Sequence, residues 1–468
     1  MGEGLLMVVC NIVGLLKGDA WEPSLLLCAC ALTALGWSLN RFVPKGDMST
    51  DRRLPYLLVT LLWLVVALFG TIPFLTTGCI RSLPDALFES MSGFTSTGAT
   101  VVNDVEQLPA TILLWRSATQ WVGGFGIILI VLAVVPTLGI NKYSLYTAEA
   151  SGADAAKSTN TTRDAVRHTL SVYLLLTFFF ITALRLSGLH WWEAINLTFT
   201  NISSGGFSTH NDGLSSLPHA SQWLLGAAML LSGINFTLMY DIGRLRFRNI
   251  KNKLEQLRYY IAMSACCILL TVITLHFHDG ETWPTALRLG TLQGISFIST
   301  TGSLLTDTEQ WWMPLLIVLM TLTLCGGMAG STAGGLKTMR IVILLRNVRN
   351  LLRGRLHPHA VSPIRLNGHP VAPHLITNVM VIFFVYAFVM VAAACLLLLM
   401  GVPAKETIGA TIGCLTGYGP GLGSCGGLGN YASMCGGAKL LLAFVMLMGR
   451  LECLTILLLF IPRFWTRR

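Results

Sequence analysis

The chain has 468 residues, of which 53% are hydrophobic and only 12% are charged. Soluble domains carry roughly 25% charged residues, so the composition excludes an ordinary soluble protein. The net charge of +10 does not indicate nucleic-acid binding, because the basic residues gather in clusters that are not interleaved with aromatic residues. The clusters are Arg41–Arg53, Lys142–Arg167, Arg244–Arg258, Lys337–Arg365 and Arg463–Arg468.

Apolar runs of membrane-spanning length lie between these clusters. A helix needs about 20 residues to cross a bilayer, and four runs meet that length: Leu54–Phe74, Trp223–Tyr240, Leu375–Met400 and Leu440–Phe460. The loops between the clusters hold only scattered Lys and Arg. By the positive-inside rule this asymmetry predicts that the basic clusters and both termini are cytoplasmic.

Two apolar segments begin the chain, Gly4–Leu16 and Pro23–Phe42. The first is short for a span, and no small-residue cleavage site follows it, so a signal peptide is the less favoured interpretation. We predict an N-terminal helix pair over residues 1–47.

The remainder contains one motif four times, rich in Gly, Ser and Thr. The copies lie at residues 92–100, 200–209, 298–304 and 415–423. Aligned on Gly98, Gly205, Gly302 and Gly419, they are separated by 205 − 98 = 107, 302 − 205 = 97 and 419 − 302 = 117 residues. This regular period predicts four pore repeats, over residues 48–145, 146–250, 251–358 and 359–468.

Each repeat has the same layout: a long apolar helix, a short helix, the glycine motif and a second apolar helix. The short helices are expected at Leu83–Met91, Trp191–Phe199, Thr285–Phe297 and Ala404–Cys414. The second apolar runs are Leu108–Leu138, Gln222–Gly243, Trp312–Leu345 and Ala438–Pro462.

The short helix and its glycine motif are too polar and too short to span a membrane. They fit a re-entrant loop, which a bilayer tolerates only where protein buries it or where it lines water. The sequence therefore predicts an all-α polytopic membrane protein with about ten spans and four pseudo-symmetric re-entrant loops around one pore.

The loops carry the chemistry that a desolvated cation needs. Backbone carbonyls and Ser or Thr hydroxyls can replace the hydration shell of an ion, and glycine permits the required backbone angles. The predicted ligands are Ser96, Thr97, Gly98, Ser203, Ser204, Gly205, Thr300, Thr301, Gly302, Gly417, Tyr418 and Gly419. The alternative is that these small residues only allow close helix packing, which four similarly spaced copies disfavour.

These loops resemble the filter loops of the Trk/Ktr/HKT superfamily of potassium transporters, and the GYGPGLG run at residues 417–423 resembles the bacterial TrkH/TrkG branch. Further matching segments are RSATQWVGGFGI (116–127), GGLKTMRI (334–341) and MGRLEC (448–453). The resemblance implies potassium uptake across a bacterial inner membrane, with potassium as the transported ligand and no organic cofactor. Gly98 implies a preference for potassium, because members with Ser there tend to pass sodium. It also implies a homodimer and a cytosolic TrkA-type nucleotide-binding subunit that docks on Arg244–Arg258 and Lys337–Arg365.

A run of small residues, Thr321–Gly335, interrupts what would otherwise be one helix. The resemblance implies that this segment is an intramembrane gate below the filter; a small-residue helix contact is the alternative. Arg450 lies near the middle of an apolar run, where an isolated charge is costly and usually functional. Glu452 is a poor ion-pair partner, because residues two apart face different sides of a helix. The predicted gating residues are Gly326, Gly327, Gly330, Ser331, Thr332, Gly334, Gly335, Lys337 and Arg450, although Lys337 fits a cytoplasmic interface equally well.

Other functions fit the residues less well. Residues 330–338 resemble a phosphate-binding loop, but Leu336 separates Gly335 from Lys337 and no strand precedes the motif. His210 and Asp212 are expected to be a solvated pair, and no metal cluster is apparent. Sodium as cargo, ion-coupled transport, and a membrane enzyme or sensor with a vestigial pore remain the alternatives.

Overall fold

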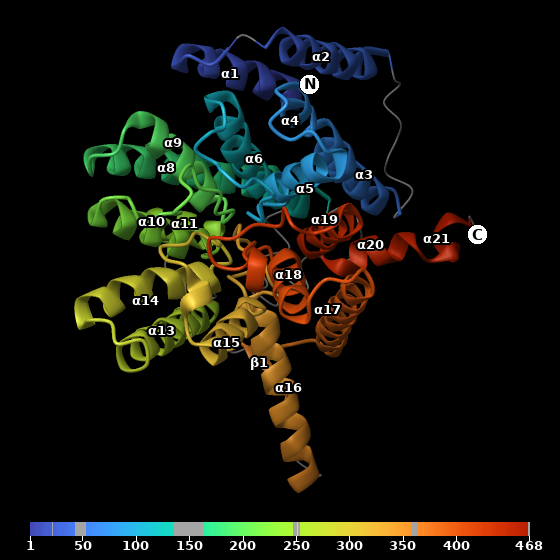
Figure 1. Cartoon of the computed structure of the whole chain (residues 1–468). Helices are drawn as coiled ribbons and strands as arrows, with labels where there is room; N and C mark the ends of the chain where they lie inside the picture. The colour runs from blue at the N-terminus through green and yellow to red at the C-terminus, as the bar shows by residue number, and fades with distance from the viewer. Residues whose placement is uncertain are drawn as a thin grey trace.

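Four helical units follow one another around a common centre in the computed structural model (Figure 1). The structure describes residues 1–20, 22–42, 53–134, 162–246, 250, 253–357, 363–367 and 369–466. Much of the predicted basic clusters Arg41–Arg53 and Lys142–Arg167 lies outside these residues.

The N-terminal pair consists of α1 (Gly2–Lys17) and α2 (Pro23–Phe42). Gly18 ends α1 with φ 98°, a left-handed conformation that favours glycine, and the chain then turns into α2. The two helices pack on each other, and α1 packs on α6 of the first unit.

The first two units contain the predicted long and short helices. The first unit is α3 (Leu54–Phe69), α4 (Ile72–Thr76), α5 (Leu83–Phe94) and α6 (Ala110–Val134). The second is α8 (Thr162–Leu186), α9 (Trp191–Ile202), α10 (His219–Ser232) and α11 (Phe236–Gly243).

The last two units repeat this order and add short elements. The third is α13 (Leu254–Phe277), α14 (Trp283–Ile298), η2 (Thr308–Gln310), α15 (Met313–Thr323) and α16 (Thr338–Leu356). A hairpin of β1 (Arg365–Leu366) and β2 (His369–Pro370) follows. The fourth is α17 (Pro373–Leu399), α18 (Ala404–Thr416), η3 (Gly423–Cys425), α19 (Gly436–Arg450), α20 (Cys453–Leu459) and α21 (Pro462–Trp465).

The second apolar run is continuous only in the first unit, as far as Val134. We expected one helix over Gln222–Gly243 and another over Ala438–Pro462, and both predictions are wrong. The pair α10 and α11 bends by 103°, and the pair α19 and α20 bends by 112°. At the first break Asn235 accepts a hydrogen bond from the Leu238 amide at 3.0 Å and so begins a new helix. At the second break Glu452 has φ 59°, which ends a regular helix.

Four helices among the described residues are long and apolar enough to cross a bilayer, or six if each bent pair is one span. The four are Tyr56–Thr76, Val166–Leu186, Leu254–Phe277 and Pro373–Leu399. Shorter apolar helices occur at Pro23–Ser38 and Met313–Thr323. The count of about ten spans therefore stays a prediction.

Polarity is inverted relative to a soluble protein. The long α17 exposes Phe384, Phe388 and Leu399, by 60% to 84% of their surface. The short helices, in contrast, are mostly buried and bring polar side chains such as Glu89 and Gln293 into the centre at 0% exposure. An apolar exterior around a polar centre is the arrangement expected of helices that face lipid and enclose a polar pathway.

Candidate functional site

The four glycine motifs share one backbone conformation. Each has a first residue with positive φ within two residues of the end of the short helix: Ser96 (53°), Ser204 (54°), Thr300 (52°) and Gly417 (73°). Two residues later each has a glycine with positive φ: Gly98 (82°), Gly206 (74°), Gly302 (73°) and Gly419 (94°). A left-handed conformation costs an L-residue about 1–2 kcal/mol, so retaining it in three non-glycine residues requires support from the surroundings.

The equivalent of Gly98 in the second loop is Gly206, one residue later than the sequence alignment predicted. In every loop the residue between the two positive-φ positions donates its amide to a carbonyl five residues earlier. The bonds are Thr97 to Ser92 (2.9 Å), Gly205 to Thr200 (2.8 Å), Thr301 to Ser296 (3.0 Å) and Tyr418 to Gly413 (3.0 Å). The spacings become 206 − 98 = 108 and 302 − 206 = 96 residues.

Ser203 therefore precedes the second motif. It is the C-cap of α9, as Thr95 and Ser299 are the C-caps of α5 and α14. In the first and third loops the cap hydroxyl is hydrogen-bonded to Thr97 or Thr301 at 2.8 Å. Gly205 offers no such hydroxyl, and the Ser203 hydroxyl donates to the Phe199 carbonyl at 2.8 Å, as the Thr95 hydroxyl does to the Met91 carbonyl at 2.7 Å. The adjacent glycines 205 and 206 made the register ambiguous in the sequence.

The four loops close into a ring by glycine-to-carbonyl contacts. A Cβ atom on Gly98 would overlap the carbonyl oxygen of Gly205, one on Gly206 that of Thr301, and one on Gly302 that of Tyr418. A Cβ atom on Gly419 would overlap the Thr97 carbonyl and so return to the first loop. Each loop thus abuts the next through a backbone contact that only glycine permits.

A cavity lies on one side of this ring and receives residues from all four loops. It is lined by Gly98, Gly206, Gly302 and Pro420, which follows Gly419. The cavity borders the last residue of the first three triplets, Gly98, Gly206 and Gly302. The first residues of two triplets face other groups: Thr300 accepts from the Gly334 amide, and Ser96 accepts from Arg450. The ring therefore has an open face and a covered face.

The covered face is occupied by residues 324–337, between α15 and α16, as the sequence predicted for a break in this helix. This intramembrane segment bonds to the other units by its backbone and by Thr332. Gly334 donates to the Thr300 hydroxyl at 2.6 Å, Gly335 to the Thr416 carbonyl at 2.9 Å, and Thr332 Oγ1 to the Ile202 carbonyl at 3.0 Å. It therefore contacts the ends of three of the four short helices.

The remaining residues predicted to gate the pathway fold this segment onto itself and onto the break between α10 and α11. The Gly326 and Gly327 carbonyls accept from Thr338 Oγ1 at 2.9 and 3.2 Å. The Gly330 carbonyl accepts from the Phe236 amide at 3.2 Å. Asn235 Nδ2 donates to the Ala329 carbonyl at 2.6 Å, Ser331 Oγ donates to the Met328 carbonyl, and Lys337 donates to the Ala333 carbonyl.

Arg450 links the intramembrane segment to the first unit. It ends α19 and donates Nη1 to the Thr332 carbonyl at 2.8 Å. Its Nη2 lies 3.4 Å from Ser96 Oγ and 3.3 Å from the Gly123 carbonyl. These acceptors are all neutral, and Glu452 pairs instead with Arg340 at 2.5 Å, as the sequence argument against an Arg450–Glu452 pair expected.

Tyr418 departs from the other loops in its side chain but not in its backbone. Its ring stacks on Phe297 with centroids 4.7 Å apart, and the residue is fully buried. The aromatic side chain therefore packs into the third unit. Two bonds fix carbonyls of the loops: Gln120 donates to the Gly205 carbonyl at 2.9 Å and Tyr431 to the Gly419 carbonyl at 2.7 Å.

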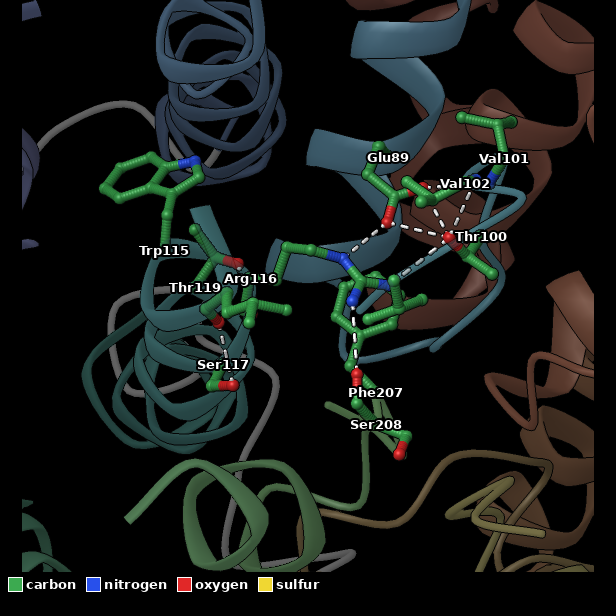
Figure 2. A network of polar contacts seen from close by, with 12 residues as sticks. Glu89, Thr100, Val101, Val102, Trp115, Arg116, Ser117, Thr119, Phe207 and Ser208 are labelled. Carbon is green, nitrogen blue, oxygen red and sulfur yellow. Dashed lines mark hydrogen bonds and ion pairs between the residues drawn. The ribbon is translucent and has the colours of Figure 1, made fainter. Parts of the chain in front are cut away.

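A buried ion pair, which sequence reasoning missed, supports the first two loops (Figure 2). Arg116 Nε lies 2.8 Å from Glu89 Oε1, and the side chains are 2% and 0% exposed. Glu89 accepts from Thr100 Oγ1 at 3.0 Å, and Arg116 donates to the Ser208 carbonyl at 3.3 Å. The guanidinium also lies 4.1 Å from the centroid of the Phe207 ring. Two opposite charges in otherwise apolar helices were the available signal in the sequence.

The structure is that of a membrane transport protein. Apolar helices surround a closed ring of re-entrant loops, and a cavity lies on one face of the ring and the intramembrane segment on the other. The comparisons specify the kind. The TrkH family, described as "Cation transport protein", matches residues 27–278 and 281–467. The chain therefore belongs to the TrkH family of cation transport proteins.

Relatives match almost from end to end. The Trk system potassium uptake protein TrkH of Salmonella typhimurium is 32% identical over 444 residues, 93% of this chain and 90% of that protein. The protein of the same name from Escherichia coli strain K12 is 31% identical over 472 residues, 98% and 95% of the two chains. The crystal structure of the potassium transporter TrkH from Vibrio parahaemolyticus superposes with a TM-score of 0.88 at 29% identity and covers 99% of this chain and 96% of that one. The predicted resemblance, the helical membrane fold and the prediction of a transporter rather than an enzyme are confirmed.

We expect the substitution Glu89→Gln to destabilise the protein by about 3–5 kcal/mol, because removing one partner leaves the other charge buried and unpaired. The measurement is the thermal unfolding of the purified protein in detergent. The matched control is Lys405→Gln, which breaks the more exposed Lys405–Glu309 pair at 2.5 Å and should change stability by about 1 kcal/mol or less. Equal unfolding temperatures for the two variants would contradict a structural role for the buried pair.

Proposed function

We propose that this chain mediates potassium uptake across the bacterial inner membrane through the ring of four loops. The observation that carries the proposal is the backbone conformation repeated in four loops. These loops contact one another in a ring between a cavity and the intramembrane segment. The potassium transport named for the relatives from Salmonella and Escherichia coli supports this cargo.

The ligands for potassium would come from the backbone of equivalent positions in the four loops. In corrected register the triplets are Ser96–Gly98, Ser204–Gly206, Thr300–Gly302 and Gly417–Gly419. Alternation of positive and negative φ along each triplet exposes carbonyl groups without side-chain obstruction, and such carbonyls replace the hydration shell of the ion. Gly206 thus joins the predicted ligand set, and Ser203 leaves it.

The intramembrane segment would gate this pathway. It occupies the carbonyls of Ile202 and Thr416 at the C-terminal ends of two short helices. Those ends carry partial negative charge and would otherwise face the ion. Arg450 adds a full positive charge against neutral acceptors, so a cation passing this level meets electrostatic repulsion as well as a physical block.

Regulation would act through α16, which follows the segment directly and projects from the body of the molecule (Figure 1). Its exposed side chains combine Arg353 and Arg355 with apolar residues such as Leu351 and Leu356, at 61% and 76% exposure. A cytosolic TrkA-type subunit docked on this basic, apolar helix and on the Arg244–Arg258 region would shift the gate. Residues 247–249, 251–252 and 358–362 of the proposed surface lie outside the described residues. Both termini would be cytoplasmic, and the protein would form a homodimer.

We expect Gly98→Ser to lower the ratio of potassium to sodium flux roughly tenfold. The residue has φ 82°, and its Cβ would overlap the Gly205 carbonyl. Strain of about 1–2 kcal/mol corresponds to a change of roughly tenfold in an equilibrium constant. The measurement is flux of each ion into liposomes that contain the purified protein.

Gly401→Ser is the matched control, because Gly401 has φ 84° and open space around its Cβ position. It should carry the same backbone strain and retain the wild-type flux ratio. Loss of selectivity in both variants alike would contradict a filter at the loops. Sodium flux alone through the wild type would overturn the potassium assignment and keep the architecture.

We expect Arg450→Gln to raise potassium flux several-fold in the absence of any cytosolic subunit, because it removes the full positive charge that bridges Thr332 of this segment to Ser96 and Gly123 of the first unit. Arg450→Lys, which keeps the charge with fewer hydrogen bonds, should remain near the wild-type rate. Both variants should elute as folded protein in size-exclusion chromatography. Unchanged flux in a folded Arg450→Gln variant would refute the electrostatic barrier.

A further inference from the structure

The segments that leave the first and second loops bring three metal-ligating side chains together outside the ring. Glu106, His210 and Asp212 each offer a ligand atom, and these atoms lie within 4.8 Å of one another. The sequence predicted only a solvated His210–Asp212 pair and no metal cluster, because Glu106 belongs to a different repeat. The fold, rather than a sequence motif, therefore creates this group.

The two ring nitrogens of His210 face carboxylates on opposite sides. Nδ1 lies 3.7 Å from Glu106 Oε1, and Nε2 lies 3.4 Å from Glu193 Oε1. Nε2 is buried, and no described group makes a hydrogen bond to it. A histidine that binds metal through one nitrogen commonly directs the other at a carboxylate, which fixes the tautomer and the ring orientation. His210 has this arrangement, with Glu193 as the outer carboxylate.

Hydrogen bonds hold the two segments in register. The Asn211 amide donates to Glu106 Oε1 at 3.2 Å, and Asn211 Oδ1 accepts from the Val105 amide at 2.7 Å. Asn211 Nδ2 also donates to Asp104 Oδ1 at 2.8 Å. The segment that carries Glu106 is therefore fixed to the segment that carries His210.

We propose that His210 Nδ1, Glu106 and Asp212 bind a divalent transition-metal ion of the Zn²⁺ class at the outer mouth. One imidazole and two carboxylates form a donor set that suits Zn²⁺, whereas Ca²⁺ and Mg²⁺ prefer all-oxygen sites. A zinc–ligand distance of about 2 Å requires the side chains to draw in on binding. Glu106 has the freedom to do so, because its side chain is 53% exposed.

The position of the site gives it a consequence for transport, and this consequence rests on the proposed function. His210 lines the cavity that Gly98, Gly206 and Gly302 also line. A bound divalent cation would neutralise the two carboxylates that ligate it at the entrance, which lowers the concentration of cations there. Micromolar zinc outside the cell would then slow potassium entry without closing the gate.

The test measures Zn²⁺ binding to the purified full-length protein in detergent by isothermal titration calorimetry, which does not depend on transport. We expect one site that His210→Ala and Glu106→Gln abolish or weaken at least tenfold. Glu193→Gln, which alters only the outer carboxylate, should weaken binding roughly tenfold to a hundredfold. Zinc should also inhibit potassium flux in wild-type liposomes and inhibit His210→Ala less.

His278→Ala is the matched control. His278 also lies beside a carboxylate, 2.8 Å from Asp279 Oδ1, but among the described residues it belongs to no group of three metal-ligating side chains. It should bind zinc as the wild type does. Absence of zinc binding by the wild type, or equal binding by folded His210→Ala and Glu106→Gln variants, would overturn the proposed site. Zinc binding that depends on His210 in a protein that transports no potassium would keep the site and reject the proposed function instead.

Discussion

Backbone amides and carbonyls inside a membrane must find partners within the protein, and the rest of this structure depends on that constraint. Non-helical backbone occurs at the centre in four glycine loops and one intramembrane segment. The intramembrane segment finds partners in other units: Gly335 donates to the Thr416 carbonyl at 2.9 Å, and Met328 to the Gly233 carbonyl at 2.8 Å. The break between α10 and α11 is thus the place where the intramembrane segment between α15 and α16 docks. Because these hydrogen bonds join the intramembrane segment to the ends of the short helices, the segment and the ring of loops form one connected network.

Two arginines in this network have different surroundings. Arg116 has a carboxylate 2.8 Å away and a ring face beneath it, so its charge is locally balanced and it can hold two loops together. Among the described residues, the acceptors of Arg450 are carbonyl and hydroxyl groups, so these contacts solvate its charge by dipoles and do not neutralise it. A neutralised ion pair mainly fixes the positions of the loops that it joins. A charge that is not neutralised also produces an electrostatic field that acts on nearby ions. In the proposed mechanism the same residue type would therefore support the pathway in one unit and obstruct it in another.

Sequence reasoning located the repeats, the short helices and the break after α15, because glycine content and hydrophobic length are local signals. It missed the bends after Ser232 and Arg450, since each depends on another segment: the first break receives the intramembrane segment, and at the second Glu452 pairs with Arg340 at 2.5 Å. It also misplaced the second loop by one residue, because adjacent glycines at 205 and 206 leave the register to the φ angles. The Glu89–Arg116 and Glu106–His210 contacts were invisible because they join residues that only the fold brings together.

The charges along the proposed pathway run in opposite senses at its two ends. Asp104, Glu106 and Glu193 lie beside Asn211 and His210, which line the cavity, and acidic side chains raise the local concentration of cations. In the proposed mechanism Arg450, on the other side of the ring, would oppose their passage. Entry would then be favoured, and exit would be the controlled step. Control at that step has a structural route, because Thr338 at the start of α16 bonds to Gly326 at 2.9 Å and Arg340 on the same turn pairs with Glu452, two residues after Arg450. A force on the projecting end of α16 would act on the intramembrane segment and on the chain next to Arg450. The segment and Arg450 would therefore be displaced together.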